Sequence, residues 1–376
     1  MNPAEKSEAL LLIGGGADAL NVRYICGFTA PDPFLYLQAA GKMHLLVSIL
    51  ELGRAGALGP SVCCHTVDTL RLNRKAQRTL GGQALGLLRH LGLKRVGVSG
   101  NCPVAVVREL EKGGIRVDVR SAPLFPQRLR KSEKELKALR ASQRAAVQAM
   151  QTAFTLIRES RVDAQGVLRQ PGGGVLSAEK LRHHLQRMLL DADCEAEELI
   201  VACGDQAVDP HGRGEGPLKA GELIVLDIFP RSRATGYWGD ITRTVIKGTP
   251  TREQARLYST VLKAQKAALS EVKAGESAKE IHDRICGRFA EAGYETGIRD
   301  GVPQGFIHST GHGVGLEIHE APSVSVRGGI LESGQVITIE PGLYYRGIGG
   351  VRIEDTVEVT ETGCRLLAPC TKAWKL

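Results

Sequence analysis

The first 125 residues alternate short apolar runs with longer amphipathic segments. Apolar runs bounded by Gly or Pro are typical of buried strands, whereas apolar positions three or four residues apart predict helices. The predicted strands are 9–15, 34–40, 43–49, 94–100 and 114–120, and the predicted helices are 74–93 and 103–114. Strands and helices in alternation predict an α/β domain.

A second pattern begins after two prolines near residue 125. A long helical pattern opens at Ser132, and Ser132 together with Glu135 forms a capping-box signal. The later predicted helices are 176–192, 251–272 and 278–293, and the predicted strands are 198–204, 222–229, 240–246, 335–340 and 350–359. This grouping predicts an α+β domain with antiparallel pairing. We therefore expect two domains, 1–125 and 126–376.

The composition excludes several classes of protein. The 376 residues are 43% hydrophobic and 24% charged, which is typical of a soluble globular chain. The net charge of +8 would suit a polyanion, but the aromatic content is only 4% and the basic residues are spread along helices such as 131–144. We therefore expect no nucleic-acid partner. No apolar run reaches the roughly 18 residues of a membrane helix, so we expect no membrane partner.

The nine cysteines include no CxxC pair. An odd count without such pairs indicates neither a disulfide framework nor a structural zinc site. The N-terminus has no basic stretch followed by a long apolar run, so no signal peptide is expected. We predict reduced thiols in a cytoplasmic protein.

Two carboxylates mark neighbouring strands in the second domain. Asp227 follows four consecutive apolar residues, a run typical of a strand that is buried on both faces. Asp240 opens the next strand after a Gly-rich turn. If the two strands pair as a hairpin, the carboxylates come close together and repel unless a cation or a shared proton lies between them. The alternative for Asp227 alone is an exposed position in a turn.

Two further carboxylates belong to later strands. Glu340 ends one of them, and Glu354 shares a strand face with Arg352. An ion pair with Arg352 is the alternative for Glu354 alone. Four uncompensated carboxylates in one sheet would be strongly destabilising, so together they indicate one or two divalent cations. Four oxygen donors with the imidazole of His312, in the Gly-rich segment 309–320, suit Mn²⁺, with Co²⁺, Fe²⁺ or Zn²⁺ as alternatives.

These segments resemble a known family. LIVLDIF, GYWGDITRT, HSTGHGVGLEIHE, ITIEPGLYY and GVRIEDT follow one another over roughly 220–360 and resemble the motifs of the pita-bread metallopeptidases, family M24. That family includes Xaa-Pro aminopeptidases, prolidases (Xaa-Pro dipeptidases) and methionine aminopeptidases. RYICGFTAP and the helices after it resemble a creatinase/prolidase N-terminal domain, which favours the first two groups. The resemblance implies an α/β N-terminal domain, an α+β pita-bread catalytic domain with a curved antiparallel sheet, and a homodimer.

The resemblance also implies a site with two metal ions. Its five ligands would be Asp227, Asp240, His312, Glu340 and Glu354, of which Asp240 and Glu354 would bridge the ions. Asp227 would hold one ion, and His312 and Glu340 the other. One departure is that Asp227 and Asp240 are further apart in this sequence than is typical of the family, and we expect the extra residues to lengthen a hairpin loop.

Four more residues match functional positions of the family. His308 and His319 match histidines that contact the substrate and stabilise the tetrahedral intermediate. His211 matches a further active-site histidine. Arg352 would support the carboxylates from behind.

The expected reaction is hydrolysis of an Xaa-Pro peptide bond by a hydroxide that bridges the two metal ions. The metals would lower the pKa of water from about 15.7 to about 7. Glu340 would accept the water proton and pass it to the leaving nitrogen, and His319 would donate a hydrogen bond to the oxyanion. The Xaa-Pro bond has no N–H, so peptidases that bind this group fail on it.

Other functions stay open. A metal-dependent relative could act on a small molecule such as dimethylsulfoniopropionate or ectoine, and an inactive pita-bread domain could serve as an interaction module. Creatinase-like hydrolases lack the metal ligands, and the His308/His312 spacing lacks the Glu of a zincin.

A catalytic thiol at Cys203 is not expected, because the metal supplies the nucleophile. Six histidines carry no motif and are expected at the surface or in the core: His44, His65, His90, His183, His184 and His282.

Overall fold

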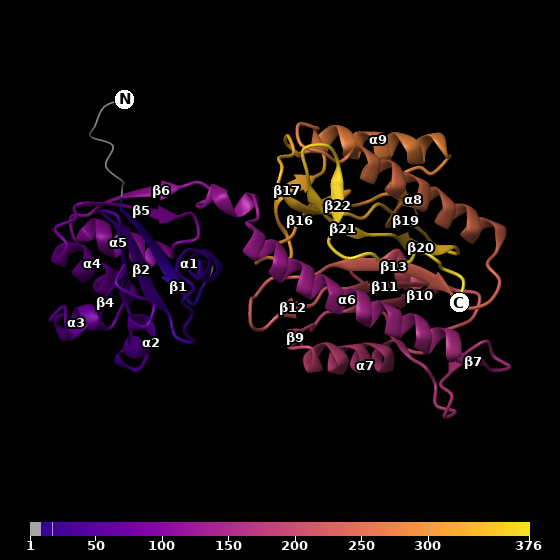
Figure 1. Cartoon of the computed structure of the whole chain (residues 1–376), viewed down its shortest axis with the longest axis horizontal. Coiled ribbons are helices and arrows are strands. Elements are labelled where there is room, and N and C mark those ends of the chain that lie inside the picture. The colour runs from indigo at the N-terminus through magenta and orange to yellow at the C-terminus, as the bar shows by residue number, and fades with distance from the viewer. Residues whose placement is uncertain (1–8, 17, 300) are drawn as a thin grey trace. The chain divides into compact units, whose positions relative to one another are not determined.

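The computed structural model describes residues 9–16, 18–299 and 301–376. It divides into two compact units, Met1–Pro126 and Gln127–Leu376 (Figure 1). Among the described residues, no helix is both long enough and apolar enough to cross a membrane.

The N-terminal unit is built around a six-stranded sheet with the order β4-β3-β2-β1-β5-β6. The strands are β1 Leu10–Gly14, β2 Phe34–Ala39, β3 Lys42–Leu46, β4 Val62–His65, β5 Arg95–Ser99 and β6 Arg116–Arg120. The pairs β1–β2 and β2–β3 are antiparallel, and the other three pairs are parallel. The helices are α1 Ala19–Cys26, α2 Leu52–Gly56, α3 Arg74–Gln77, α4 Leu80–His90 and α5 Val104–Lys112. Leucines of α4 and α5 share one apolar core with the sheet, and α1 and α2 share another, so the predicted α/β fold is confirmed.

The single helix predicted over 74–93 is wrong, because the chain breaks between α3 and α4. Thr79 has an extended backbone, and its hydroxyl accepts a hydrogen bond from the Gly82 N–H at 3.0 Å. Thr79 is therefore the N-cap of a new helix, a role that threonine favours over a helix interior. The sequence pattern also missed β4, α1 and α2, since these elements are too short for a clear period.

The second unit repeats one arrangement twice, a pair of helices against an antiparallel sheet (Figure 1). In the first half, α6 Glu133–Glu159 and α7 Ala178–Asp191 pack on β10 Ile200–Cys203, β11 Leu223–Ile228 and β13 Ile241–Ile246. In the second half, α8 Arg252–Glu271 and α9 Ala278–Glu291 pack on the order β17-β16-β18-β21-β22. These strands are β16 Gly311–Gly313, β17 Glu320–Val324, β18 Val336–Ile339, β21 Asp355–Val359 and β22 Cys364–Leu366.

The remaining strands form short pairs. They are β7 Arg161–Val162 with β8 Leu168–Arg169, β9 Cys194–Glu195 with β12 Arg231–Ser232, β14 Gly297–Arg299 with β15 Val302–Gln304, and β19 Gly342–Tyr345 with β20 Gly349–Arg352. Every pair of named strands in this unit is antiparallel, as predicted. The capping box that opens α6 is also confirmed, with Glu135 accepting from the Ser132 N–H at 2.9 Å. The segment between β11 and β13 is more than a lengthened loop, because it contains β12.

The single strand predicted over 350–359 is wrong. The chain forms β20, which pairs with β19, and then β21, which pairs with β18. Between them the Glu354 N–H donates to the Thr242 carbonyl oxygen at 3.1 Å. The chain therefore crosses from one sheet to another at Glu354, which lies where the two halves of the unit meet.

Candidate metal centre

Asp227 and Asp240 are brought together by the β11–β13 pair. Asp227 lies opposite Thr242, and Asp240 is two residues before Thr242. Because side chains alternate along a strand, all three lie on the same face. Gln143 of α6 fixes the backbone of Asp240 with two hydrogen bonds of 2.8 Å, one to its N–H and one to its carbonyl oxygen.

Glu354 and Glu340 approach the same place from the second half of the unit. The Thr242 hydroxyl donates to Glu354 Oε2 at 2.7 Å, which turns that carboxylate towards β13. Glu340 follows β18 directly, and its Oε1 accepts a hydrogen bond from the Thr338 hydroxyl at 3.0 Å. Both carboxylates are thus oriented by threonines, Glu354 by one in β13 and Glu340 by one in the strand that it follows.

His312 of β16 completes the cluster. Its Nδ1 faces the Gly313 carbonyl oxygen at 3.1 Å and therefore carries a proton. Its Nε2 faces Glu340 Oε1 at 3.1 Å and Asp240 Oδ2 at 3.6 Å, where it binds either a proton or a cation. One ligand atom each from Asp240, His312 and Glu354 lie within 4.8 Å of one another.

The glycines on either side of His312 allow this close approach. A Cβ atom on Gly311 would lie 1.9 Å from the Thr338 carbonyl oxygen, and one on Gly313 would lie 2.4 Å from the Ala321 carbonyl oxygen. Only glycine lets β16 fit between its neighbours at these two positions.

The negative charges of the clustered carboxylates repel one another. Burial raises the pKa of Asp240 well above its usual value, and the charges of Glu354, Asp227 and Glu340 raise it further. Burial, followed by the charges of Glu340 and Asp227, raises the pKa of Glu354 well above its usual value. Burial is the largest single influence on Glu340 and acts against its ionisation, but the hydrogen bond and charge of His312, together with the other positive charges nearby, outweigh it and lower the pKa of Glu340 to about 2. The cluster holds more negative charge than the nearby side chains neutralise.

The surroundings of Asp227 suit a bound cation. Its Oδ2 binds Arg352 Nη2 at 2.7 Å, while its Oδ1 is buried without a hydrogen-bond partner. A buried carboxylate oxygen with no partner is costly unless something positive binds it. The donors present are carboxylate oxygens and one imidazole nitrogen, a set that suits divalent cations such as Mn²⁺.

The sequence left open an ion pair between Arg352 and Glu354, which share a strand face. The structure does not form this pair. The guanidinium of Arg352 instead joins Asp227 to Tyr344, donating from Nη1 to the Tyr344 oxygen at 2.8 Å. Tyr344 Oη lies 2.8 Å from His308 Nε2, and His308 Nδ1 lies 2.7 Å from the Ser309 carbonyl oxygen. His308 Nδ1 therefore carries the proton and Nε2 accepts from Tyr344. Burial lowers the pKa of His308 to about 4, so it is neutral at pH 7.

Tyr344 is a residue that the sequence analysis missed. Its signal in the sequence was its place in the segment ITIEPGLYY, four residues after Glu340. The Tyr344 hydroxyl contacts His308 and Arg352, which belong to other segments of the chain. The role of Tyr344 is therefore visible only in the structure.

The other two histidines lie at the edge of the cluster. His319 packs edge-on against His312, with ring centroids 4.3 Å apart, and burial followed by the charge of His312 lowers its pKa. His211 is exposed, and its charge also lowers the pKa of His308 and His319. The structure therefore brings all four histidines of the predicted site to the same region.

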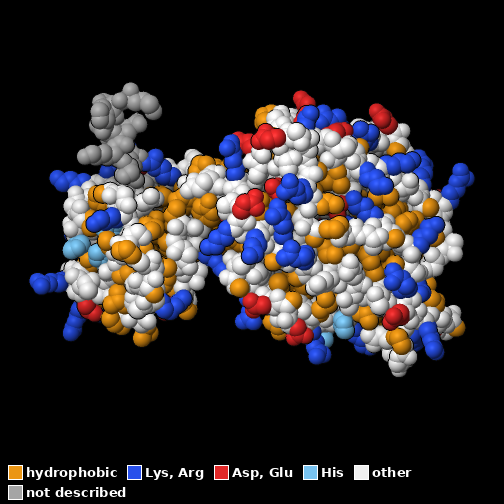
Figure 2. Space-filling model, viewed as in Figure 1, with side chains coloured by type: hydrophobic (Ala, Val, Ile, Leu, Met, Phe, Trp, Pro, Cys, Tyr) orange, Lys and Arg blue, Asp and Glu red, His pale blue; other side chains and the backbone are white. Residues whose placement is uncertain are grey.

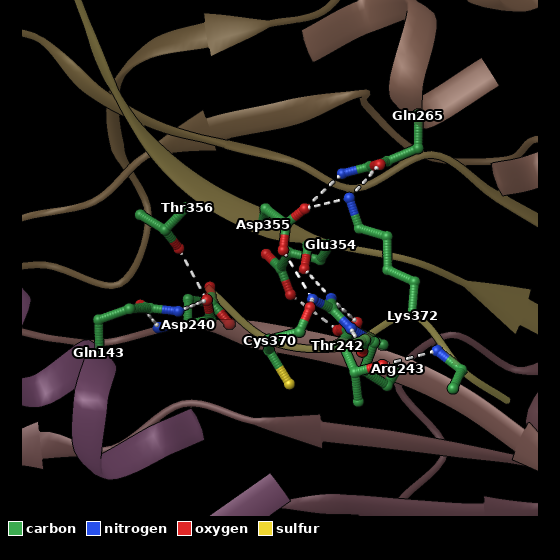
Figure 3. A network of polar contacts seen from close by, with 12 residues as sticks. Gln143, Asp240, Thr242, Arg243, Gln265, Glu354, Asp355, Thr356, Cys370 and Lys372 are labelled. Atoms are coloured by element: carbon green, nitrogen blue, oxygen red, sulfur yellow. Dashed lines mark hydrogen bonds and ion pairs between the residues drawn. The ribbon is translucent and has the colours of Figure 1, made fainter. Parts of the chain in front are cut away.

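A buried network lies behind the carboxylates (Figure 3). Arg243 of β13 donates to the Glu354 carbonyl oxygen, to the Cys370 carbonyl oxygen at 3.0 Å and to Asp355 Oδ1 at 2.7 Å. Asp355 also binds Lys372 Nζ at 2.6 Å. This network ties the C-terminal segment to the strand crossing that carries Glu354.

We expect Arg243→Met to lower the free energy of unfolding by about 3–5 kcal/mol, because it leaves buried acceptors and part of the charge of Asp355 unpaired. The side chain of Arg243 is 1% exposed. Urea unfolding checks this expectation. The control is Arg365→Met, since Arg365 is 65% exposed and should contribute less than about 1 kcal/mol. Equal losses in the two variants would contradict the structural role of the network.

The loop that carries His319 is anchored by a second ion-pair cluster. Glu320 Oε1 lies 2.5 Å from Lys131 Nζ, and Glu320 Oε2 lies 2.9 Å from Arg128 Nη2. Lys131 lies just before α6, and its side chain is 1% exposed. The residue next to His319 is therefore held from a distant part of the chain.

Glu320→Gln should lower the free energy of unfolding by about 3 kcal/mol, because the buried charge of Lys131 loses its partner. Thermal or urea unfolding measures the change. Asp283→Asn removes an exposed partner of Lys279 on α9 and should cost no more than about 1 kcal/mol. A loss at Glu320 no larger than in this control would show that the pair is not energetically important.

The fold and the site together define a class of protein. Two antiparallel sheets, each covered by a helix pair, enclose a centre of carboxylates and one imidazole that fits divalent cations. This is the pita-bread arrangement of a metal-dependent enzyme. The chain belongs to metallopeptidase family M24, whose family model matches residues 137–361.

Relatives extend the match beyond this segment. The Xaa-Pro dipeptidase of Pyrococcus horikoshii is 34% identical over 280 residues, which cover 73% of each chain. The structure of an Xaa-Pro dipeptidase from Bacillus anthracis is similar with a TM-score of 0.82 and 25% identity, covering 98% of this chain and 95% of that one. An X-Pro aminopeptidase from Thermotoga maritima MSB8 has the same fold, with a TM-score of 0.81 at 23% identity, covering 98% and 97%.

Proposed function

We propose that this protein hydrolyses Xaa-Pro peptide bonds and binds two divalent cations, preferably Mn²⁺. The cations would be held by Asp227, Asp240, His312, Glu340 and Glu354. The observation that carries the proposal is the buried group of Asp240, His312 and Glu354, with ligand atoms within 4.8 Å of one another. Membership of family M24, and relatives named Xaa-Pro dipeptidase, support the substrate class.

Divalent cations bound here would lower the pKa of a water molecule and polarise the scissile carbonyl. Glu340 is ionised and directed into the cluster, so we assign it the task of accepting the water proton and passing it to the leaving nitrogen. His319 is assigned the hydrogen bond to the developing oxyanion.

His308 and His211 take different parts in this proposal. Both ring nitrogens of His308 already have partners, so its contact with substrate requires exchange of one of them, most simply the Tyr344 hydroxyl. His211 lies exposed beside the other histidines, a position that supports contact with the bound peptide.

The experiment that tests the proposal compares Ala-Pro, Ala-Pro-Ala and Ala-Ala as substrates of the Mn²⁺-loaded protein. Cleavage of Ala-Pro alone would identify a dipeptidase, and release of Ala from Ala-Pro-Ala would identify an aminopeptidase. Ala-Ala should be a poor substrate if the proline ring is recognised. Failure to cleave either proline peptide, in protein shown to hold metal, would overturn the proposal.

That negative result would favour the second candidate, a metal-dependent enzyme of the same superfamily that acts on a small molecule. Absence of stoichiometric Mn²⁺ binding would instead favour an inactive interaction module. The homodimer that the resemblance implies stays a prediction, which sedimentation of the full chain checks.

A further inference from the structure

The N-terminal unit contains a histidine cluster that the proposed function does not use. His44 of β3 and His65 of β4 have stacked rings, and His44 Nδ1 lies 3.1 Å from His65 Nε2. His90, the last residue of α4, packs edge-on against His65 with ring centroids 5.7 Å apart. Figure 2 shows histidine side chains reaching the surface of this unit.

The strand register explains why these groups converge. His44 lies opposite Cys63, and His65 is two residues after Cys63, so the three side chains share one face of the sheet. Leu46 also lies on this face, since it is two residues after His44, and it belongs to the core that includes leucines of α4. The end of α4 therefore brings His90 to the edge of the sheet, where β4 is the outermost strand.

The geometry of the pair suits a metal ion. Zinc binds imidazole nitrogen at about 2.0–2.1 Å, so two nitrogens at a tetrahedral angle lie about 3.3 Å apart. The His44–His65 separation of 3.1 Å is close to that value. Burial, followed by neighbouring positive charge, lowers the pKa of both His44 and His65, so both rings are neutral and able to bind metal at pH 7.

We propose that His44, His65 and His90 form a binding site for a borderline transition-metal ion, Zn²⁺, that fastens the edge strand β4 to the end of α4. His44 and His65 would supply two ligand nitrogens, which already lie 3.1 Å apart. Within the described residues, a group of three ligand atoms within 4.8 Å occurs only at Asp240, His312 and Glu354, so His90 must turn to reach the ion. His90 is exposed, which leaves it free to do so. The thiol of Cys63, on the same face, suits the same class of ion.

The test titrates full-length, Mn²⁺-loaded protein with Zn²⁺ and counts bound zinc after equilibrium dialysis. Because zinc also competes with Mn²⁺ at the carboxylate centre, the informative quantity is the difference in bound zinc between wild type and each variant. Wild-type protein should bind one Zn²⁺ more than His65→Ala or His90→Ala does. If the variants still bind this ion, their dissociation constant should be higher than that of wild type by more than about 10–100-fold, because a loss of that size is typical of removing a group that only supports a ligand. His183→Ala is the matched control, because it removes an exposed histidine of α7.

Hydrogen exchange gives a second readout in the same samples. Zn²⁺ should slow exchange in 62–65 and at the end of α4 in wild type and in His183→Ala, but not in His90→Ala. The exposed position of His90 makes its removal compatible with folding even if His65→Ala does not fold. Equal zinc content and equal protection in wild type and His90→Ala would overturn the proposal and leave His44 and His65 as a hydrogen-bonded pair.

Discussion

Replacing Glu340 with Gln is expected to lower kcat for an Xaa-Pro peptide by about 10³-fold or more while the fold survives. The amide has the same shape, and its oxygen can still accept the 3.0 Å hydrogen bond from the Thr338 hydroxyl. It cannot accept a proton from water, and it neutralises one of the charges in the cluster. The measurement is kcat at saturating Mn²⁺, together with circular dichroism and metal content.

The matched control for this experiment is Glu332→Gln. Glu332 is an exposed carboxylate that pairs with Arg130, and its neutralisation should leave kcat unchanged. Turnover by Glu340→Gln within a few-fold of wild type, with metal bound, would show that another group accepts the proton.

Removal of divalent cations is expected to abolish peptide hydrolysis and to destabilise the second unit. At a free metal concentration one hundred times the dissociation constant, binding should add about 2.7 kcal/mol to the free energy of unfolding. The physical reason is the crowding of Asp227, Asp240, Glu340 and Glu354, whose negative charge the nearby side chains do not balance. Thermal unfolding with a chelator, and again after Mn²⁺ is restored, measures the difference.

The sign of the pH dependence follows from the same carboxylates. The pKa values of Asp240 and Glu354 are raised in the folded protein, so their contribution to metal-free stability is present below pH 4 and falls as pH rises through the raised values. The pKa of Glu340 is lowered to about 2, so its contribution to stability has the opposite sign and is lost as the pH falls from 4.5 towards that value. Added Mn²⁺ should therefore stabilise the protein more at pH 7 than at pH 5.

A variant at the centre provides the control for metal removal. Asp240→Asn removes one ligand charge and part of the repulsion, so its metal-free form should be at least as stable as metal-free wild type. Its unfolding midpoint should respond little to Mn²⁺. A full response to Mn²⁺ in this variant would place the stabilising cation elsewhere.

Local signals in the sequence were enough to predict much of the architecture. Alternating apolar runs predicted five of the six strands of the N-terminal sheet, and Ser132 with Glu135 predicted the start of α6. These features depend on residues that are neighbours in the chain, where the period of side-chain direction is fixed by backbone geometry. The same local reasoning placed Asp227 at the end of a buried strand and Asp240 at the start of the next.

Only the tertiary structure decided which groups meet. Arg352 shares a strand face with Glu354 in the sequence, yet its partners are Asp227 and Tyr344, because the chain crosses between sheets at Glu354. The pairing of Arg243 with Asp355, and of His44 with His65, likewise joins different strands. A periodic pattern specifies the face on which a side chain lies, but contacts between distant segments depend on strand order and register, which are set by packing of the whole unit.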